Sequence, residues 1–218
     1  MLSFIEIVYR HSDFIIIYKP AGLSVHKDEE EIGLTHYVAR QLGVSQVWLV
    51  HRLDKVTSGL LILALNKNAA RELSSLFAEH LIHKTYIALS DAKPKKKQGK
   101  IIGDMQKSRR GAWKLCQSKE NPAITQFTSF SIKPHLRLFV LHPKTGKTHQ
   151  LRVAMKSLGS PILGDELYGN KNHQVERTYL HAYQLDFIYQ GTEFKIQHLP
   201  IQGALFKEQA VIEKLKNL

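Results

Sequence analysis

Residues 47–65 read VWLVHRLDKVTSGLLILAL, and this stretch decides how the middle of the chain folds. Residues 47–50 and 60–65 are apolar enough to form two buried strands. The polar loop between them, residues 51–59, contains a single carboxylate, Asp54. Strands often present functional side chains on such loops, which makes Asp54 a candidate catalytic residue. The alternative is that Asp54 only caps its own turn through its side chain.

The rest of the chain predicts more strands than helices. Apolar and β-branched runs predict strands at residues 4–9, 14–18, 84–89, 125–132, 136–141, 183–189 and 193–197. Apolar spacing predicts helices at 34–42, at 68–80 with Asn68 as N-cap, at 148–158 and at 204–215. Residues 93–100 are rich in lysine and predict a basic loop. Because short turns join most strands, the pattern indicates an α+β fold with a largely antiparallel sheet.

The charge of the chain indicates its class of partner. Lysine and arginine number 31 against 19 aspartates and glutamates, a formal net charge of +12. Such an excess is typical of proteins that bind nucleic acid phosphates, although a lysine-rich soluble surface would also produce it.

Other features of the composition argue against membranes, disulfides and metals. The single cysteine, the missing signal peptide and the lack of a long apolar run predict a cytoplasmic protein with no membrane partner. His80 and His83 lack a third ligand at motif spacing, so we expect no metal site.

The loop at residues 51–59 belongs to a longer pattern. HRLDKVTSGLLILAL at residues 51–65 resembles the signature of the RluA-type pseudouridine synthases. KPAGLSVH at 19–26, KTYIA at 84–88, PKTGKTHQLRV at 143–153 and PILGD at 161–165 resemble further motifs of that family, in the same order. Three features depart from the family pattern. Lys147 stands where arginine is usual, Ala154 stands where histidine is common, and residues 188–191 stand where a His-Pro pair is expected.

The resemblance implies the pseudouridine synthase fold, a long mixed and mostly antiparallel sheet in two lobes around a central basic cleft. It also implies one catalytic domain over residues 1–218, without a separate N-terminal RNA-binding module. The reaction turns a uracil base and gains or loses no atoms, so the resemblance implies no cofactor.

The resemblance also assigns the catalytic residues. Asp54 corresponds to the catalytic aspartate, and Arg152 to the cation that keeps it ionised and oriented. Tyr86 corresponds to the tyrosine that lies against the uracil ring. Without the resemblance, Arg152 would be an exposed helix cation and Tyr86 an aromatic residue of the core.

Other residues are candidates for RNA binding. Arg52 is placed beside Asp54 to fill the space that a flipped base leaves. His51 contacts RNA or orients the loop, and Lys95, Lys96 and Lys97 provide phosphate contacts or form a solvated turn.

We therefore expect an RNA pseudouridine synthase that isomerises specific uridines in structured rRNA and/or tRNA. The partner is an RNA stem-loop recognised by shape, and the enzyme acts as a monomer. Two other functions remain open: a nucleoside-cleaving hydrolase that uses Asp54 and releases free uracil, and a catalytically silent RNA-binding protein.

Overall fold

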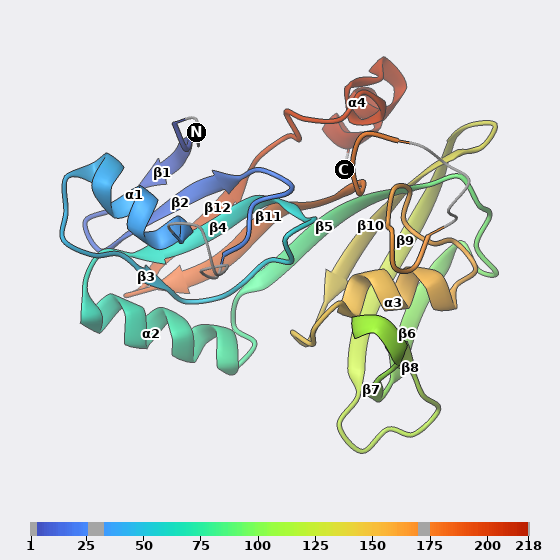
Figure 1. Ribbon diagram of the computed structural model, residues 1–218, viewed down its shortest axis with the longest axis horizontal. Coiled ribbons are helices and arrows are strands. Elements are labelled where there is room, and N and C mark those ends of the chain that lie inside the picture. Colours follow the sequence, from blue (N-terminus) through green and yellow to red (C-terminus); the bar gives the residue numbers. More distant parts are fainter. Residues whose placement is uncertain (1–3, 26–32, 170–174, 218) are drawn as a thin grey trace. The chain divides into compact units, whose positions relative to one another are not determined.

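The computed structural model describes residues 4–25, 33–169 and 175–217 (Figure 1). The chain divides into two compact units, which are described separately. Unit 1 comprises Met1–Lys84 and Ala182–Leu199, and unit 2 comprises Thr85–His181 and Pro200–Leu218. Strands paired mostly antiparallel dominate both units, which confirms the predicted α+β class with a large, mostly antiparallel sheet. The prediction of one catalytic domain over residues 1–218 stays a prediction.

Unit 1 is built on strands in the order β1-β2-β4-β11. Its elements are β1 (Ile7–Arg10), β2 (Phe14–Lys19), α1 (Leu34–Leu42), β3 (Trp48–Leu49), β4 (Ser58–Ala64), α2 (Lys67–Ala78), most of β11 (Leu180–Tyr189) and β12 (Thr192–Gln197). Strand β3 pairs with β4, and β12 pairs with β11. The antiparallel register of β2 and β4 sets Lys19 opposite Gly59. The loop that follows Lys19 and the loop that precedes Gly59 therefore have neighbouring ends.

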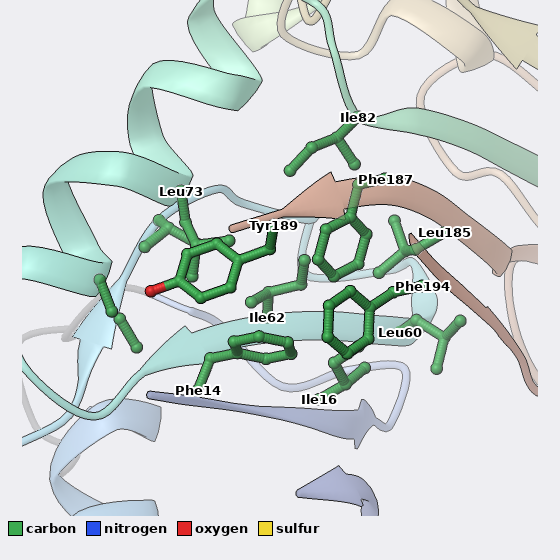
Figure 2. Packing of buried hydrophobic residues seen from close by; sticks show 13 residues of the cluster. Phe14, Ile16, Leu60, Ile62, Leu73, Ile82, Leu185, Phe187, Tyr189 and Phe194 are labelled. Atoms are coloured by element: carbon green, nitrogen blue, oxygen red, sulfur yellow. The ribbon is translucent and has the colours of Figure 1, made fainter. Parts of the chain in front are cut away.

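An aromatic and aliphatic cluster forms the core of unit 1 (Figure 2). Phe14 contributes from β2, Leu73 from α2, and Phe187 and Phe194 from the two C-terminal strands. Successive strand residues point to opposite faces of the sheet, and the neighbours of these core residues are also almost fully buried. The central strands β2 and β4 are therefore covered on both faces, which explains why both read as continuous apolar runs.

The two helices of unit 1 begin and end at identifiable residues. Helix α1 ends at Gly43, whose left-handed conformation closes the last turn, as the sequence predicts. Helix α2 begins two residues earlier than predicted, since the side chain of Asn66 accepts a hydrogen bond from the Ala69 amide. The prediction that Asn68 is the N-cap is therefore wrong, and Asn68 lies inside the helix.

Unit 2 is built on strands in the order β5-β10-β9-β6, with a separate two-stranded pair, β7-β8. Its elements are β5 (His83–Ser90), which starts in unit 1, β6 (Gln98–Gly103), β7 (Met105–Lys107), η1 (Arg109–Gly111), β8 (Trp113–Leu115), β9 (Ala123–Lys133), β10 (Leu136–Pro143), α3 (Gln150–Ser157), η2 (Leu205–Lys207) and α4 (Gln209–Lys216). Helix α3 packs against β8, β9 and β10, and α4 packs against β9. The strands predicted at 125–132 and 136–141 are confirmed as β9 and β10, which pair antiparallel as a hairpin.

Two predictions in unit 2 need correction. The basic loop is shorter than predicted, because strand β6 begins at Gln98. The helix predicted over residues 204–215 is broken, because Glu208 has an extended backbone between η2 and α4. Among the described residues, no helix is long and apolar enough to cross a membrane.

Candidate active site

The Asp54 loop, residues 50–57 between β3 and β4, is held by its own backbone and by a second loop. The Thr57 amide donates to the carbonyl oxygen of Asp54 at 3.0 Å, which closes the turn. The Gly22 amide donates to the carbonyl oxygen of Lys55 at 2.8 Å. These bonds fix the backbone at the half-buried Asp54 and on its C-terminal side. A fixed backbone limits the directions in which a short aspartate side chain can point.

Lys19 reinforces this junction from inside unit 1. Its side chain is fully buried, and Nζ donates to the carbonyl oxygens of Pro20 (2.9 Å), Leu23 (2.8 Å) and Lys55 (3.3 Å). A buried ammonium group is very costly unless its N–H groups are bonded. Lys19 therefore ties residues 20–23 to the Asp54 loop. Sequence reasoning missed this role and identified residues 19–26 only as a family motif.

Gly59 sets the exit of the Asp54 loop into β4. Its φ is +118°, a value that side-chain-bearing residues rarely adopt. A Cβ atom at this position would overlap the Ala182 carbonyl oxygen of β11 and lie 2.6 Å from the Ala182 nitrogen. The close approach of β4 to β11 therefore requires glycine here.

His51 is packed into unit 1 at the start of the loop. Its Nε2 accepts a hydrogen bond from the Ile62 amide at 2.9 Å, and its ring stacks on Phe77 with centroids 4.1 Å apart. Burial lowers the pKa of His51 from 6.5 to about 3, and the positive charge of Lys84 adds to this effect. The ring is therefore neutral at physiological pH and carries its proton on Nδ1. These contacts give His51 the loop-orienting role, while a contact with RNA stays a prediction.

The motif at residues 143–153 folds as a loop that leads into α3. Gln150 is buried, and its Oε1 accepts from the Thr145 hydroxyl (2.7 Å) and the Lys147 amide (3.0 Å). Its Nε2 donates to the Ile124 carbonyl and the Thr125 hydroxyl on β9. All these bonds run to one side chain, so Gln150 fixes the start of α3 against β9. Sequence reasoning gave Gln150 no role.

Arg152 lies buried on α3 and is paired with Asp165. Its Nε donates to Asp165 Oδ2 at 2.7 Å and its Nη2 to Oδ1 at 2.9 Å. The guanidinium carbon lies 5.0 Å from the centre of the Tyr168 ring. Arg152 is therefore not the exposed helix cation that its position alone suggested. The Asp165 partner was missed, although the PILGD motif was the available signal.

The other candidate residues lie on β5, on the Asp54 loop and on the basic loop. Tyr86 is half-buried on β5, opposite Leu141 of β10. Arg52 is exposed in unit 1, and the lysines of residues 95–97 are exposed in unit 2. The backbone beneath these lysines is anchored, because the Lys95 amide donates to Leu158 and the Lys97 carbonyl accepts from Ser129.

The structure places the predicted site residues in both units. Asp54, Arg52 and His51 belong to unit 1, whereas Tyr86 and Arg152 belong to unit 2. Their meeting in one site stays a prediction. Within the described ranges, no group of three or more histidine, cysteine, aspartate or glutamate side chains is arranged to hold a metal ion.

Comparison with known proteins identifies the family. Residues 13–157, which include β2, the Asp54 loop, Tyr86 and Arg152, match the family described as RNA pseudouridylate synthase. The chain belongs to this family. The RluA-type resemblance is thereby confirmed, and the protein is an isomerase that acts on RNA.

The relatives extend over nearly the whole chain. An uncharacterized RNA pseudouridine synthase of Haemophilus influenzae is 66% identical over 212 residues, covering 97% of this chain and 95% of the relative. The ribosomal large subunit pseudouridine synthase D of Borreliella burgdorferi is 32% identical, covering 93% of this chain and 67% of the relative. Among solved structures, the human RNA pseudouridylate synthase domain containing 1 has a TM-score of 0.75 at 26% identity, covering 89% of this chain and 83% of that one.

Proposed function

We propose that this pseudouridine synthase isomerises specific uridines in structured rRNA and/or tRNA, with Asp54 as its catalytic carboxylate. The observation that carries the proposal is the anchoring of the Asp54 loop by Lys19, Gly22 and Thr57. Catalysis by a positioned side chain requires that the backbone beneath it does not move. A turn-capping aspartate would need no buried lysine behind its loop.

The proposed chemistry needs a carboxylate at the sugar. The N1–C1′ bond of uridine breaks, the uracil turns, and a C5–C1′ bond forms. The C5 proton is then lost to solvent, and N1 takes up a proton, so no atom is gained or lost. Asp54 either attacks C1′ or removes a proton from the sugar as the bond opens. Both roles require the ionised carboxylate, which a nearby guanidinium favours. We assign this task to Arg152.

Tyr86 and Arg52 complete the proposed set. Tyr86 supplies an aromatic face for the uracil and assists the departure of the C5 proton. The target uridine must leave its stack before Asp54 reaches the sugar, and the exposed Arg52 occupies the space left in the RNA. The name of the Borreliella burgdorferi relative, a ribosomal large subunit enzyme, favours rRNA as the substrate.

The decisive test compares Asp54→Asn with Asp186→Asn. Asp186 is also half-buried in unit 1, where both of its carboxylate oxygens accept from the side-chain amide of Gln184. Single-turnover assays would follow tritium release from RNA that carries C5-labelled uridine. We expect Asp54→Asn to bind RNA normally and to lose at least about a thousandfold in rate, and Asp186→Asn to react as wild type. Residual activity within about tenfold of wild type would remove Asp54 from the mechanism.

The same assay separates the other two functions. A nucleoside-cleaving hydrolase would release free uracil, and a silent RNA-binding protein would bind RNA without releasing tritium. Mapping pseudouridines in total RNA from cells with and without the protein then identifies the substrate RNA. A site that disappears from rRNA or tRNA, and returns with the wild-type gene but not with Asp54→Asn, is the target.

A further inference from the structure

Asp165 is a buried carboxylate to which the proposed chemistry gives no task. Its side chain is almost fully enclosed, as is that of Arg152. Oδ2 accepts from Arg152 Nε, and Oδ1 accepts from Arg152 Nη2, the Leu167 amide (3.1 Å) and the Tyr168 amide (3.2 Å). One carboxylate thus binds a guanidinium edge and the backbone of the following turn at the same time.

The arrangement fixes the direction of the Arg152 guanidinium. A bidentate pair holds the guanidinium in the plane of the carboxylate, and it engages only two of the five N–H groups. The Tyr168 ring lies on the guanidinium at 5.0 Å and adds a second constraint. The direction of the remaining N–H groups is therefore set by Asp165 and Tyr168, and not by the rotamer preference of a long side chain on α3.

The turn that carries Asp165 is itself rigid. Gly164 has a φ of +73°, and a Cβ there would overlap the Arg177 carbonyl oxygen. The Gly169 amide donates to the Asp165 carbonyl at 2.7 Å, and a Cβ at Gly169 would lie 2.6 Å from that oxygen. The backbone on both sides of Asp165 is thus closely packed against other backbone atoms. A carboxylate on a fixed backbone also fixes the orientation of the side chain that it binds.

We propose that Asp165 is a positioning residue, which holds Arg152 in the orientation that its task in the reaction requires. This inference rests on the proposed function, in which Arg152 acts on the Asp54 carboxylate. An ion pair that served stability alone would be a poor choice, because well-packed apolar residues often stabilise a buried site as well or better. Orientation of a charged group is a task that apolar residues cannot perform.

The first comparison is between Asp165→Asn and Glu166→Gln. Asparagine keeps an oxygen for the Leu167 and Tyr168 amides but loses the charge and an acceptor for Arg152. Glu166 is exposed on the same turn, so its variant removes an adjacent charge as a control. We expect Asp165→Asn to lower the single-turnover rate at saturating RNA by about 10- to 100-fold, while the RNA dissociation constant stays within about twofold. Glu166→Gln should react as wild type.

The second comparison asks whether Asp165 acts through Arg152. In an Arg152→Gln background, the added Asp165→Asn change should lower the rate no further, because the group that Asp165 orients has gone. The double variant buries no unpaired charge, and in Arg152→Gln the Asp165 carboxylate keeps its bonds to the Leu167 and Tyr168 amides. These two variants can therefore be compared even if Asp165→Asn alone does not fold.

The outcomes distinguish this inference from the proposed function. If Arg152→Gln reacts at the wild-type rate, Arg152 has no part in the reaction, and the proposed function fails at that residue. If Arg152→Gln is slow but Asp165→Asn reacts normally, only the positioning role is overturned. A double variant slower than Arg152→Gln by about tenfold or more would also overturn it, because Asp165 would then act independently.

Discussion

The free energy of unfolding of this protein should fall as the pH falls, because His51 is held neutral only in the folded state. In the folded chain the neutral ring accepts from the Ile62 amide and stacks on Phe77. Burial, with the charge of Lys84 as a second cause, lowers the pKa of His51 from 6.5 to about 3. In the unfolded chain the ring takes up a proton near its ordinary pKa. The unfolded state therefore binds more protons between these two values, and stability is lost as the pH falls.

The size of the effect follows from the two pKa values. Each pH unit well below 6.5 costs about 1.4 kcal/mol for one proton, until the folded ring titrates near pH 3. Integrated from pH 7.5 to pH 5, the loss is about 2 kcal/mol at most.

The variant His51→Gln isolates this contribution from the other histidines. At pH 7.5 the variant should be less stable than wild type, because it loses the ring stack on Phe77. The difference in free energy of unfolding should narrow by about 1–2 kcal/mol by pH 5, because only the wild type loses stability by keeping His51 neutral. Urea unfolding at several pH values measures the gap, and His36→Gln, an exposed histidine on α1, controls for loss of a histidine as such. A gap that stays constant from pH 7.5 to pH 5 would refute the reasoning.

Three further predictions concern RNA binding and the loop exit. Alanine at the three lysines of residues 95–97 should weaken RNA binding and leave the rate at saturating RNA unchanged. The slope of log affinity against log salt concentration should become shallower by up to about 0.7–0.9 per lost phosphate contact. If the variant binds normally at every salt concentration, these residues form only a solvated turn. Arg52→Ala should instead slow the single-turnover reaction of bound RNA, and a full rate would end its role in base flipping. Gly59→Ala should lower the free energy of unfolding by about 3 kcal/mol or more, because its Cβ overlaps the Ala182 carbonyl. Gly22→Ala, at a φ of +87° with open space around it, should cost only about 1 kcal/mol in the same urea unfolding measurement, and equal losses would contradict the steric argument.

Sequence reasoning predicted the elements whose signals are local. Helix α1 has apolar residues at helical spacing and a glycine after its last turn, and both features operate within nine or ten residues. The buried β4 strand is recognisable from its own composition. The candidate Asp54 followed from its loop and the family motif together, since an isolated aspartate between strands would not have been distinguished from a turn cap.

The elements that were missed depend on contacts far away in the chain. Asn66 rather than Asn68 caps α2, and its side-chain amide also donates to Asp13, which is 53 residues earlier. Strand β6 shows only two buried residues, Ile101 and Gly103, because it pairs with β9 alone and its other positions are exposed. No local apolar pattern marks such a strand, and Lys100 within it and the lysines just before it favour a loop in any local interpretation.

Three motif residues to which sequence reasoning gave no role share one kind of contact. Lys19, Gln150 and Asp165 all lie in family motifs, and each binds backbone or buried side chains through several bonds at once. We propose that they hold the residues beside them, including Asp54 and Arg152, to which the proposed reaction assigns tasks. A change at such a residue should therefore lower the rate with bound RNA and leave RNA affinity nearly intact. The exposed lysines of residues 95–97 lie outside every motif, so we expect the choice of RNA to depend on surfaces of that kind rather than on the motifs.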